Sequence, residues 1–173
     1  ARGIAAAARE TMKRRPVVLL AGIAAAAVVV AVVGLPIAGG PFGDRPVQHT
    51  LRADDTRLLA QGRRVYEAQC AACHGARLEG QPNWRQRGPD GRLPAPPHDA
   101  SGHTWHHPDE MLFRITKLGV AKAANLVDYA SAMPAYGAVL TDEEIVAALS
   151  WIKSQWPAAI RERHDQLNRQ APP

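Results

Sequence analysis

The pentapeptide CAACH at residues 70–74 is the feature that most constrains this chain, because it holds the only two cysteines among 173 residues. Two cysteines three positions apart cannot form a disulfide scaffold, so the core has to be built from apolar side chains. On a helix, this spacing places both thiols on one edge, and His74 follows directly. The sequence therefore predicts that Cys70, Cys73 and His74 act together on one group.

Two thiols with this spacing can add to the two vinyl groups along one edge of a porphyrin, while the following imidazole ligates the iron. The motif predicts one covalent haem c, with Cys70 and Cys73 as attachment points and His74 as proximal metal ligand. A zinc site is one alternative, although its two further ligands would have to come from histidines that lack zinc-finger spacing: His98, His103, His106 and His107. The other alternative, a thioredoxin-like redox pair, needs a βαβ context that the sequence does not offer.

Three helices are predicted around this motif, and no alternating run is long enough for a strand. The first begins at Asp54 or Asp55, either of which can cap it, and reaches Cys70. The second follows Pro108 and ends at Gly119. The third opens with the capping box of residues 141–144 and ends at Pro157. The fold class is therefore all-α. Residues 75–107 contain five prolines and five glycines and are expected to form a long ordered loop that wraps a bound group.

The N-terminal part predicts a membrane anchor. Residues 16–38 are uncharged, and a helix of this length would rise about 34 Å, which is enough to cross a bilayer. Residues 1–15 carry five basic side chains and one acidic one, so the positive-inside rule places them in the cytoplasm and the rest of the chain outside. A cleaved signal peptide is the alternative, but the apolar run is long and lacks a good cleavage site. Whether translation begins before Ala1 or at Met12 stays open.

Beyond the anchor, the sequence predicts a flexible linker over residues 39–53, one domain over residues 54–156 and a charged C-terminal tail over residues 157–173. Most of the formal net charge of +5 lies before residue 39, and the remainder has no basic stripe interleaved with aromatic side chains. This distribution excludes a nucleic-acid-binding protein.

Residues 54–156 resemble a class I cytochrome c domain, and the whole chain is similar to the membrane-anchored monohaem cytochromes c of bacteria. The resemblance rests on Gly62 and Tyr66, the CAACHG of residues 70–75, the MPAYG of residues 133–137 and the TDEE of residues 141–144. It implies that the first and last helices cross closely around the haem. In this crossing, Gly62 and Tyr66 would face Leu149 and Ile152.

The resemblance also implies a distal methionine followed by proline, which Met133 matches. A thioether opposite an imidazole keeps the iron low-spin and raises its reduction potential. The rivals are Met12, which precedes the predicted anchor, and Met111, which follows two acidic residues at a helix start. The alternative for Met133 is an ordinary core methionine.

A proline carbonyl that accepts the proximal imidazole N–H is a further family feature. Residues 95–97 match it without deciding between Pro96 and Pro97, and Pro97 is taken as the candidate cofactor-binding residue.

Trp105 is the candidate for a haem-propionate contact. The four histidines around it could include another propionate contact or bind a second metal, but a polar surface loop is the favoured interpretation for three of them, with His107 capping the next helix. Arg77, Arg85, Arg87 and Arg92 could steer an acidic partner or form a solvated face.

The expected function is one-electron transfer by a protein tethered to the bacterial cytoplasmic membrane, with its haem domain on the periplasmic side and no catalytic residue of its own. The expected partners are a quinol-oxidising bc-type complex as donor and a terminal oxidase or photosynthetic reaction centre as acceptor. Two alternatives stay open: a fixed haem subunit of a larger membrane oxidoreductase, and a haem peroxidase or ligand sensor in which Met133 leaves the iron.

Overall fold

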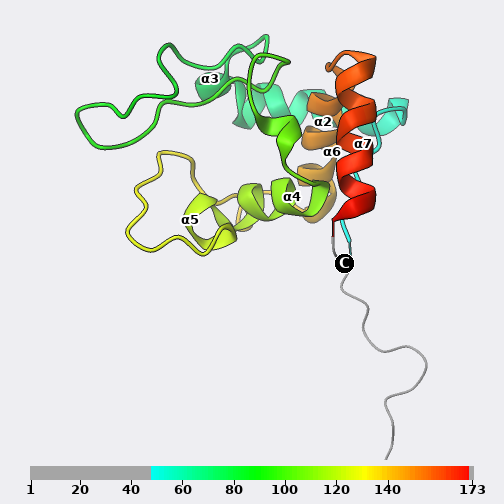
Figure 1. Ribbon diagram of the computed structural model, residues 1–173. Coiled ribbons are helices and arrows are strands. Elements are labelled where there is room, and N and C mark those ends of the chain that lie inside the picture. Colours follow the sequence, from blue (N-terminus) through cyan, green and yellow to red (C-terminus); the bar gives the residue numbers. More distant parts are fainter. Residues whose placement is uncertain (1–47, 172–173) are drawn as a thin grey trace, which may run out of the picture. The chain divides into compact units, whose positions relative to one another are not determined.

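The computed structural model describes residues 48–171, which consist of helices joined by loops, with no strand in this part of the chain (Figure 1). The predicted all-α class is therefore confirmed for the domain. The predicted anchor, residues 16–38, lies outside the described residues. Within residues 48–171, no helix combines the length and apolarity needed to cross a membrane. The elements are α2 (Thr56–Gln69), α3 (Ala71–His74), the 3₁₀ helix η1 (Thr104–His106), α4 (Asp109–Leu118), α5 (Val120–Ala123), α6 (Asp142–Ser154) and α7 (Ala158–Gln170).

The helix ends follow from local hydrogen bonding. Asp55 rather than Asp54 caps α2, because its carboxylate accepts a 3.1 Å bond from the backbone N–H of Leu58. The capping box of α6 is complete, with Thr141 and Glu144 each accepting the other's backbone N–H. Helix α4 ends at Gly119, whose φ of +83° favours glycine. All three predicted helices are present.

Helices α2 and α6 cross at close range, as the family resemblance implies. A Cβ atom on Gly62 would lie 1.9 Å from the carbonyl oxygen of Ala147 and 3.0 Å from Cβ of Trp151. The fully buried Tyr66 packs against Trp151 with ring centroids 4.7 Å apart. Gly62 thus faces Ala147 and Trp151 most closely, while the predicted Leu149 and Ile152 share the buried apolar cluster with Tyr66. Residues 147 and 151 are one helical turn apart and so share the face that meets α2, whereas Leu149 and Ile152 lie elsewhere around α6 in the apolar core.

The segment predicted as a charged tail instead contains a helix, α7, which contacts η1 and the start of α4. Its anchor is His164, which is fully buried and donates from Nε2 to the carbonyl of His107 at 3.0 Å. Asn168 accepts a 2.7 Å bond from the backbone N–H of Asp109, and Asp165 pairs with the buried Lys153 at 2.6 Å. Helix α7 is thus held largely by buried polar contacts.

Burial, together with the Lys153 ammonium group, lowers the pKa of His164 below its ordinary value of about 6.5. Asp109, Asp165 and the carbonyl of His107 oppose this shift without reversing it. As the pH falls below about 6.5, the unfolded chain therefore binds more protons on His164 than the folded chain does. Stability from this group is consequently lost toward acid, by up to about 1.4 kcal/mol per pH unit.

We expect His164→Gln to lower the free energy of unfolding at pH 7 and also to make its decline between pH 6.5 and 5 shallower than in the parent. Denaturant titrations at stepped pH measure both effects. His106→Gln is the matched control, because His106 is exposed and should leave the decline unchanged. An unaltered slope in His164→Gln would show that this histidine does not carry the acid sensitivity.

Candidate haem-binding site

Both cysteines lie at the junction of α2 and α3. Cys70 is the C-cap of α2, and the single turn of α3 places His74 so that its backbone N–H bonds to the Cys70 carbonyl at 2.9 Å. The Cys70 side chain is half-buried and Cys73 is exposed. Burial, with a smaller contribution from Cys73, raises the pKa of the Cys70 thiol to about 11. The junction thus presents two thiols next in sequence to a buried imidazole.

His74 is oriented as a metal ligand requires. Its side chain is only 7% exposed, and Nδ1 donates to the carbonyl of Pro96 at 2.8 Å, which leaves Nε2 free to ligate. Burial lowers the pKa of His74 although the Pro96 carbonyl opposes the shift, so the ring is neutral near pH 7. The acceptor is therefore Pro96 and not the predicted Pro97. The Pro97 carbonyl lies instead against Gly102 and within 3.5 Å of the Thr104 hydroxyl.

The long loop after α3 closes on itself beside His74. The Gly80 N–H donates to the His74 carbonyl, and the Gln81 N–H donates to the Ala95 carbonyl, both at 2.8 Å. Leu78 is buried with a φ of +68°, a strained conformation for a bulky side chain, and its carbonyl accepts from the N–H of His98 at 2.8 Å. These bonds hold Pro96 in place as the acceptor for His74.

His98 belongs to the site, although the sequence favoured a surface position for most histidines of this segment. Its ring stacks on that of His74 at 3.9 Å, and its Nδ1 lies 2.8 Å from the Thr104 hydroxyl. Its carbonyl accepts a 2.7 Å bond from Nε1 of Trp156. Burial, with His74 and His103 adding to it, holds the pKa of His98 well below its ordinary value. The one sequence signal for this role was its position directly after the two prolines.

The other histidines stack on aromatic rings. His103 lies 5.3 Å from Trp84 and meets His107 edge-on at 5.4 Å, while His106 stacks on Trp105 at 3.7 Å. His107 does not cap α4, whose N-cap is Pro108. Among residues 48–171, no group of three or more His, Cys, Asp or Glu side chains is placed to hold a metal ion. This part of the chain therefore gives no ligand set to the zinc alternative or to a second metal.

Trp105 provides a test of whether a haem fits. Its indole Nε1 is the one buried side-chain nitrogen or oxygen without a hydrogen-bond partner among the described residues. Because indole can only donate, this atom needs an acceptor, and leaving it unpaired costs about 1–3 kcal/mol. The carboxylate of a haem propionate is a suitable acceptor. The guanidinium of Arg163 lies 5.2 Å from the centre of the same ring and adds positive charge there.

Met133 lies half-buried in the segment between α5 and α6. This segment is tied to the cysteine junction by Tyr136, whose hydroxyl donates to the Gln69 carbonyl at 2.7 Å. Gln69 directly precedes Cys70. Burial raises the pKa of Tyr136, and the nearby Cys70 and Cys73 add to that shift. The chain that carries Met133 thus returns to the haem-attachment motif, a link that the sequence did not predict.

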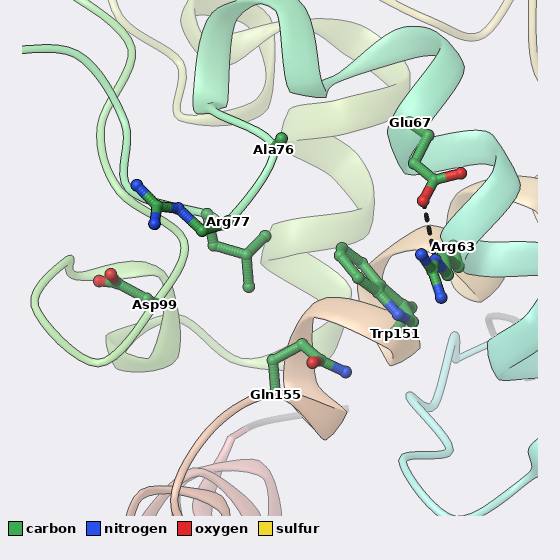
Figure 2. Close-up of a pocket in the computed structure, with 8 residues that line it drawn as sticks. Arg63, Glu67, Ala76, Arg77, Asp99, Trp151 and Gln155 are labelled. Atoms are coloured by element: carbon green, nitrogen blue, oxygen red, sulfur yellow. Dashed lines mark hydrogen bonds and ion pairs between the residues drawn. The ribbon is translucent and has the colours of Figure 1, made fainter.

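The predicted basic residues lie on the surface of the loop after α3. Arg85 stacks on Trp84 at 3.9 Å, and Arg87 lies 5.4 Å from the ring of Tyr129, in the Met133 segment. A surface hollow of about 570 Å³ lies between this loop, α2 and the C-terminal end of α6 (Figure 2), and Arg63 pairs with Glu67 there at 2.8 Å. None of the predicted haem ligands lines this hollow. Its lining residues are Arg63, Glu67, Ala76, Arg77, Leu78, Asp99, Trp151 and Gln155.

Comparison with known proteins identifies the domain. The sequence model of the family described as cytochrome c oxidase, cbb3-type, subunit III matches residues 57–152, which is more than half of the chain. No curated protein and no solved structure matches the chain. The match spans the attachment motif, His74, Met133 and the crossing of α2 with α6. The chain therefore belongs to this cytochrome c family and carries a class I c-type cytochrome domain, the type that holds haem c and transfers electrons.

Proposed function

We propose that this protein is a membrane-tethered electron-transfer protein that holds one haem c on the periplasmic side of the bacterial cytoplasmic membrane. When bound, haem c supplies an iron that alternates between Fe(II) and Fe(III) and so takes up and releases one electron. The geometry at His74 carries the proposal. Its buried ring is held by Pro96 through Nδ1, so Nε2 is left free to ligate, and Cys73 directly precedes this residue in the sequence.

Each proposed site residue has its own task. Cys70 and Cys73 would attach the porphyrin through thioether bonds, and His74 would ligate the iron. Met133 would supply a thioether ligand, which favours Fe(II) and raises the reduction potential. Trp105 donates its unpaired N–H to a propionate. Ligands to the iron from both His74 and Met133 would suit one-electron transfer, because neither ligand would have to leave.

The membrane tether rests on the 23 uncharged residues at positions 16–38 and on the basic residues that precede them. The donor is proposed to be a bc-type complex and the acceptor a terminal oxidase or reaction centre. The family description favours an oxidase as one partner. It also supports the alternative in which the chain is a fixed oxidase subunit. Purification in mild detergent separates the two, because only a fixed subunit stays with the oxidase in a constant ratio.

We expect the haem to remain with the polypeptide after extraction with acidified acetone, because thioether bonds survive a treatment that releases non-covalent haem. The measurement is the haem spectrum of the precipitated chain expressed with haem-attachment machinery. Cys73→Ala should leave a single thioether link, and the double variant Cys70→Ala/Cys73→Ala should lose all haem to the solvent. Met111→Ala, which changes neither thiol, should keep its colour. Haem that leaves the parent chain would contradict the proposal.

The peroxidase or ligand-sensor alternative requires an open iron position. It would gain support only if the reduced parent protein bound carbon monoxide readily, since a thioether ligand has to leave before carbon monoxide can bind. The same measurement on the Met133 variants is given in the Discussion.

A further inference from the structure

The segment that carries Met133 is hydrogen-bonded to the rest of the described domain near its ends but not in its middle. It leaves α5, extends beyond the helices and returns to α6 as the yellow loop of Figure 1. Over residues 127–135, the described structure contains a single hydrogen bond, from the Met133 N–H to the Ser131 hydroxyl at 3.1 Å. This bond is local to the segment. The position of Met133 therefore depends on where the chain is next attached to the rest of the domain.

That attachment is Tyr136, three residues after Met133. Its backbone N–H donates to the Thr116 carbonyl in the last turn of α4 at 2.9 Å, and its hydroxyl donates to the Gln69 carbonyl at the end of α2 at 2.7 Å. Carbonyls in the last turn of a helix lack partners within that helix. Tyr136 thus donates to helix-terminal carbonyls of both α4 and α2. The α2 carbonyl, that of Gln69, belongs to the residue directly before Cys70.

The next residue tightens the same attachment. The Gly137 N–H donates to the Lys117 carbonyl at 3.0 Å, and a Cβ atom at position 137 would lie 2.9 Å from that carbonyl oxygen. A side chain there would push the segment away from α4. Residues 136 and 137 therefore hold the chain at a defined distance from α4, just after the free portion that carries Met133.

We propose that Tyr136 is a positioning residue that holds the Met133 segment against the haem-attachment motif and so sets how readily Met133 leaves the iron. This inference rests on the proposed role of Met133 as distal ligand. The hydroxyl of Tyr136 is the relevant group, because it alone links the segment to the residue before Cys70. Without it, the segment stays attached to α4 but loses its bond to α2.

The test is Tyr136→Phe in the full haem-loaded chain, which keeps the ring and removes only the hydroxyl. We expect imidazole to bind the oxidised protein about two- to tenfold faster, as befits the loss of one neutral hydrogen bond. The charge-transfer band of Fe(III)–thioether ligation should also weaken as free imidazole is added at lower concentration than in the parent. Tyr129→Phe is the matched control, since Tyr129 lies in the same segment and its hydroxyl makes no hydrogen bond among the described residues.

Gly137→Ala is a second variant, which displaces the segment from the α4 side with the Tyr136 hydroxyl intact. It should also speed imidazole binding. A purely structural role for Tyr136 would lower the free energy of unfolding but leave the imidazole rate and the thioether band as in Tyr129→Phe, and that result would overturn the inference. If the thioether band survives Met133→Ala, Met133 is not the ligand, and the proposed function fails at that point together with this inference.

Discussion

Replacing Met133 with alanine is expected to open the sixth position of the haem iron and convert a low-spin protein to a high-spin one. Alanine has no atom that can bind iron. Residues 127–135 also make no hydrogen bond to another part of the described chain that would bring a substitute iron ligand into place. The reduced variant should therefore bind carbon monoxide stoichiometrically, whereas the parent should bind it hardly at all. The absorption spectrum with and without carbon monoxide measures this change.

Met133→His tests the chemical type of the sixth ligand, because it replaces the thioether with another group that can bind iron. A second imidazole should keep the iron six-coordinate and low-spin but lower the reduction potential, because imidazole favours Fe(III) more than a thioether does. The thioether charge-transfer band should vanish in both variants. Met111→Ala is the control, because Met111 lies in α4 and should leave the band and the potential intact. A band that survives Met133→Ala would assign the distal ligand to another residue.

Gly62→Ala is expected to destabilise the domain by about 3 kcal/mol or more, because the added methyl group would lie 1.9 Å from the carbonyl oxygen of Ala147. Both sides of this contact are helix backbone, so the clash can be relieved only by moving α2 away from α6. The shift would also loosen the packing of Tyr66 on Trp151. Denaturant unfolding of the haem protein measures the loss.

The sign of this effect is decisive. Helix propensity alone would make alanine more stable than glycine by about 1 kcal/mol, so a stabilised Gly62→Ala would contradict the close crossing. Ala68→Gly is the control on the exposed face of the same helix, and it should cost only about 1 kcal/mol. Gly62→Ala adds a methyl group and Ala68→Gly removes one. The close crossing nevertheless predicts that both variants lower the free energy of unfolding, and that Gly62→Ala lowers it more.

Local signals in the sequence were sufficient for most of the secondary structure. The cap at Asp55, the capping box at Thr141 and the stop at Gly119 are short-range hydrogen-bonding or conformational effects, and each lies where it was predicted. Helix α7 was missed for the corresponding reason. Its docking depends on His164 and Asn168, which bond to residues more than fifty positions away, and the helix shows no clear apolar stripe.

The attachment motif was equally local, because Cys70, Cys73 and His74 lie within five residues and their spacing alone dictates the chemistry. The choice between Pro96 and Pro97 was not local. Both are adjacent in sequence, and only the closure of the loop onto Leu78 and Ala95 decides which carbonyl meets His74. The stacking of His98 on His74 follows from the same closure.

The sequence by itself determined the all-α class, the haem-attachment motif and the ends of three helices, because each depends on neighbours within about four residues. The tertiary structure alone decided which residues of α6 face Gly62, which carbonyl orients His74, and how Tyr136 returns the Met133 segment to α2. These contacts join residues that are 22 to 89 positions apart. Such pairs are selected by packing and by the need to satisfy buried polar groups, and neither is visible in a short stretch of sequence.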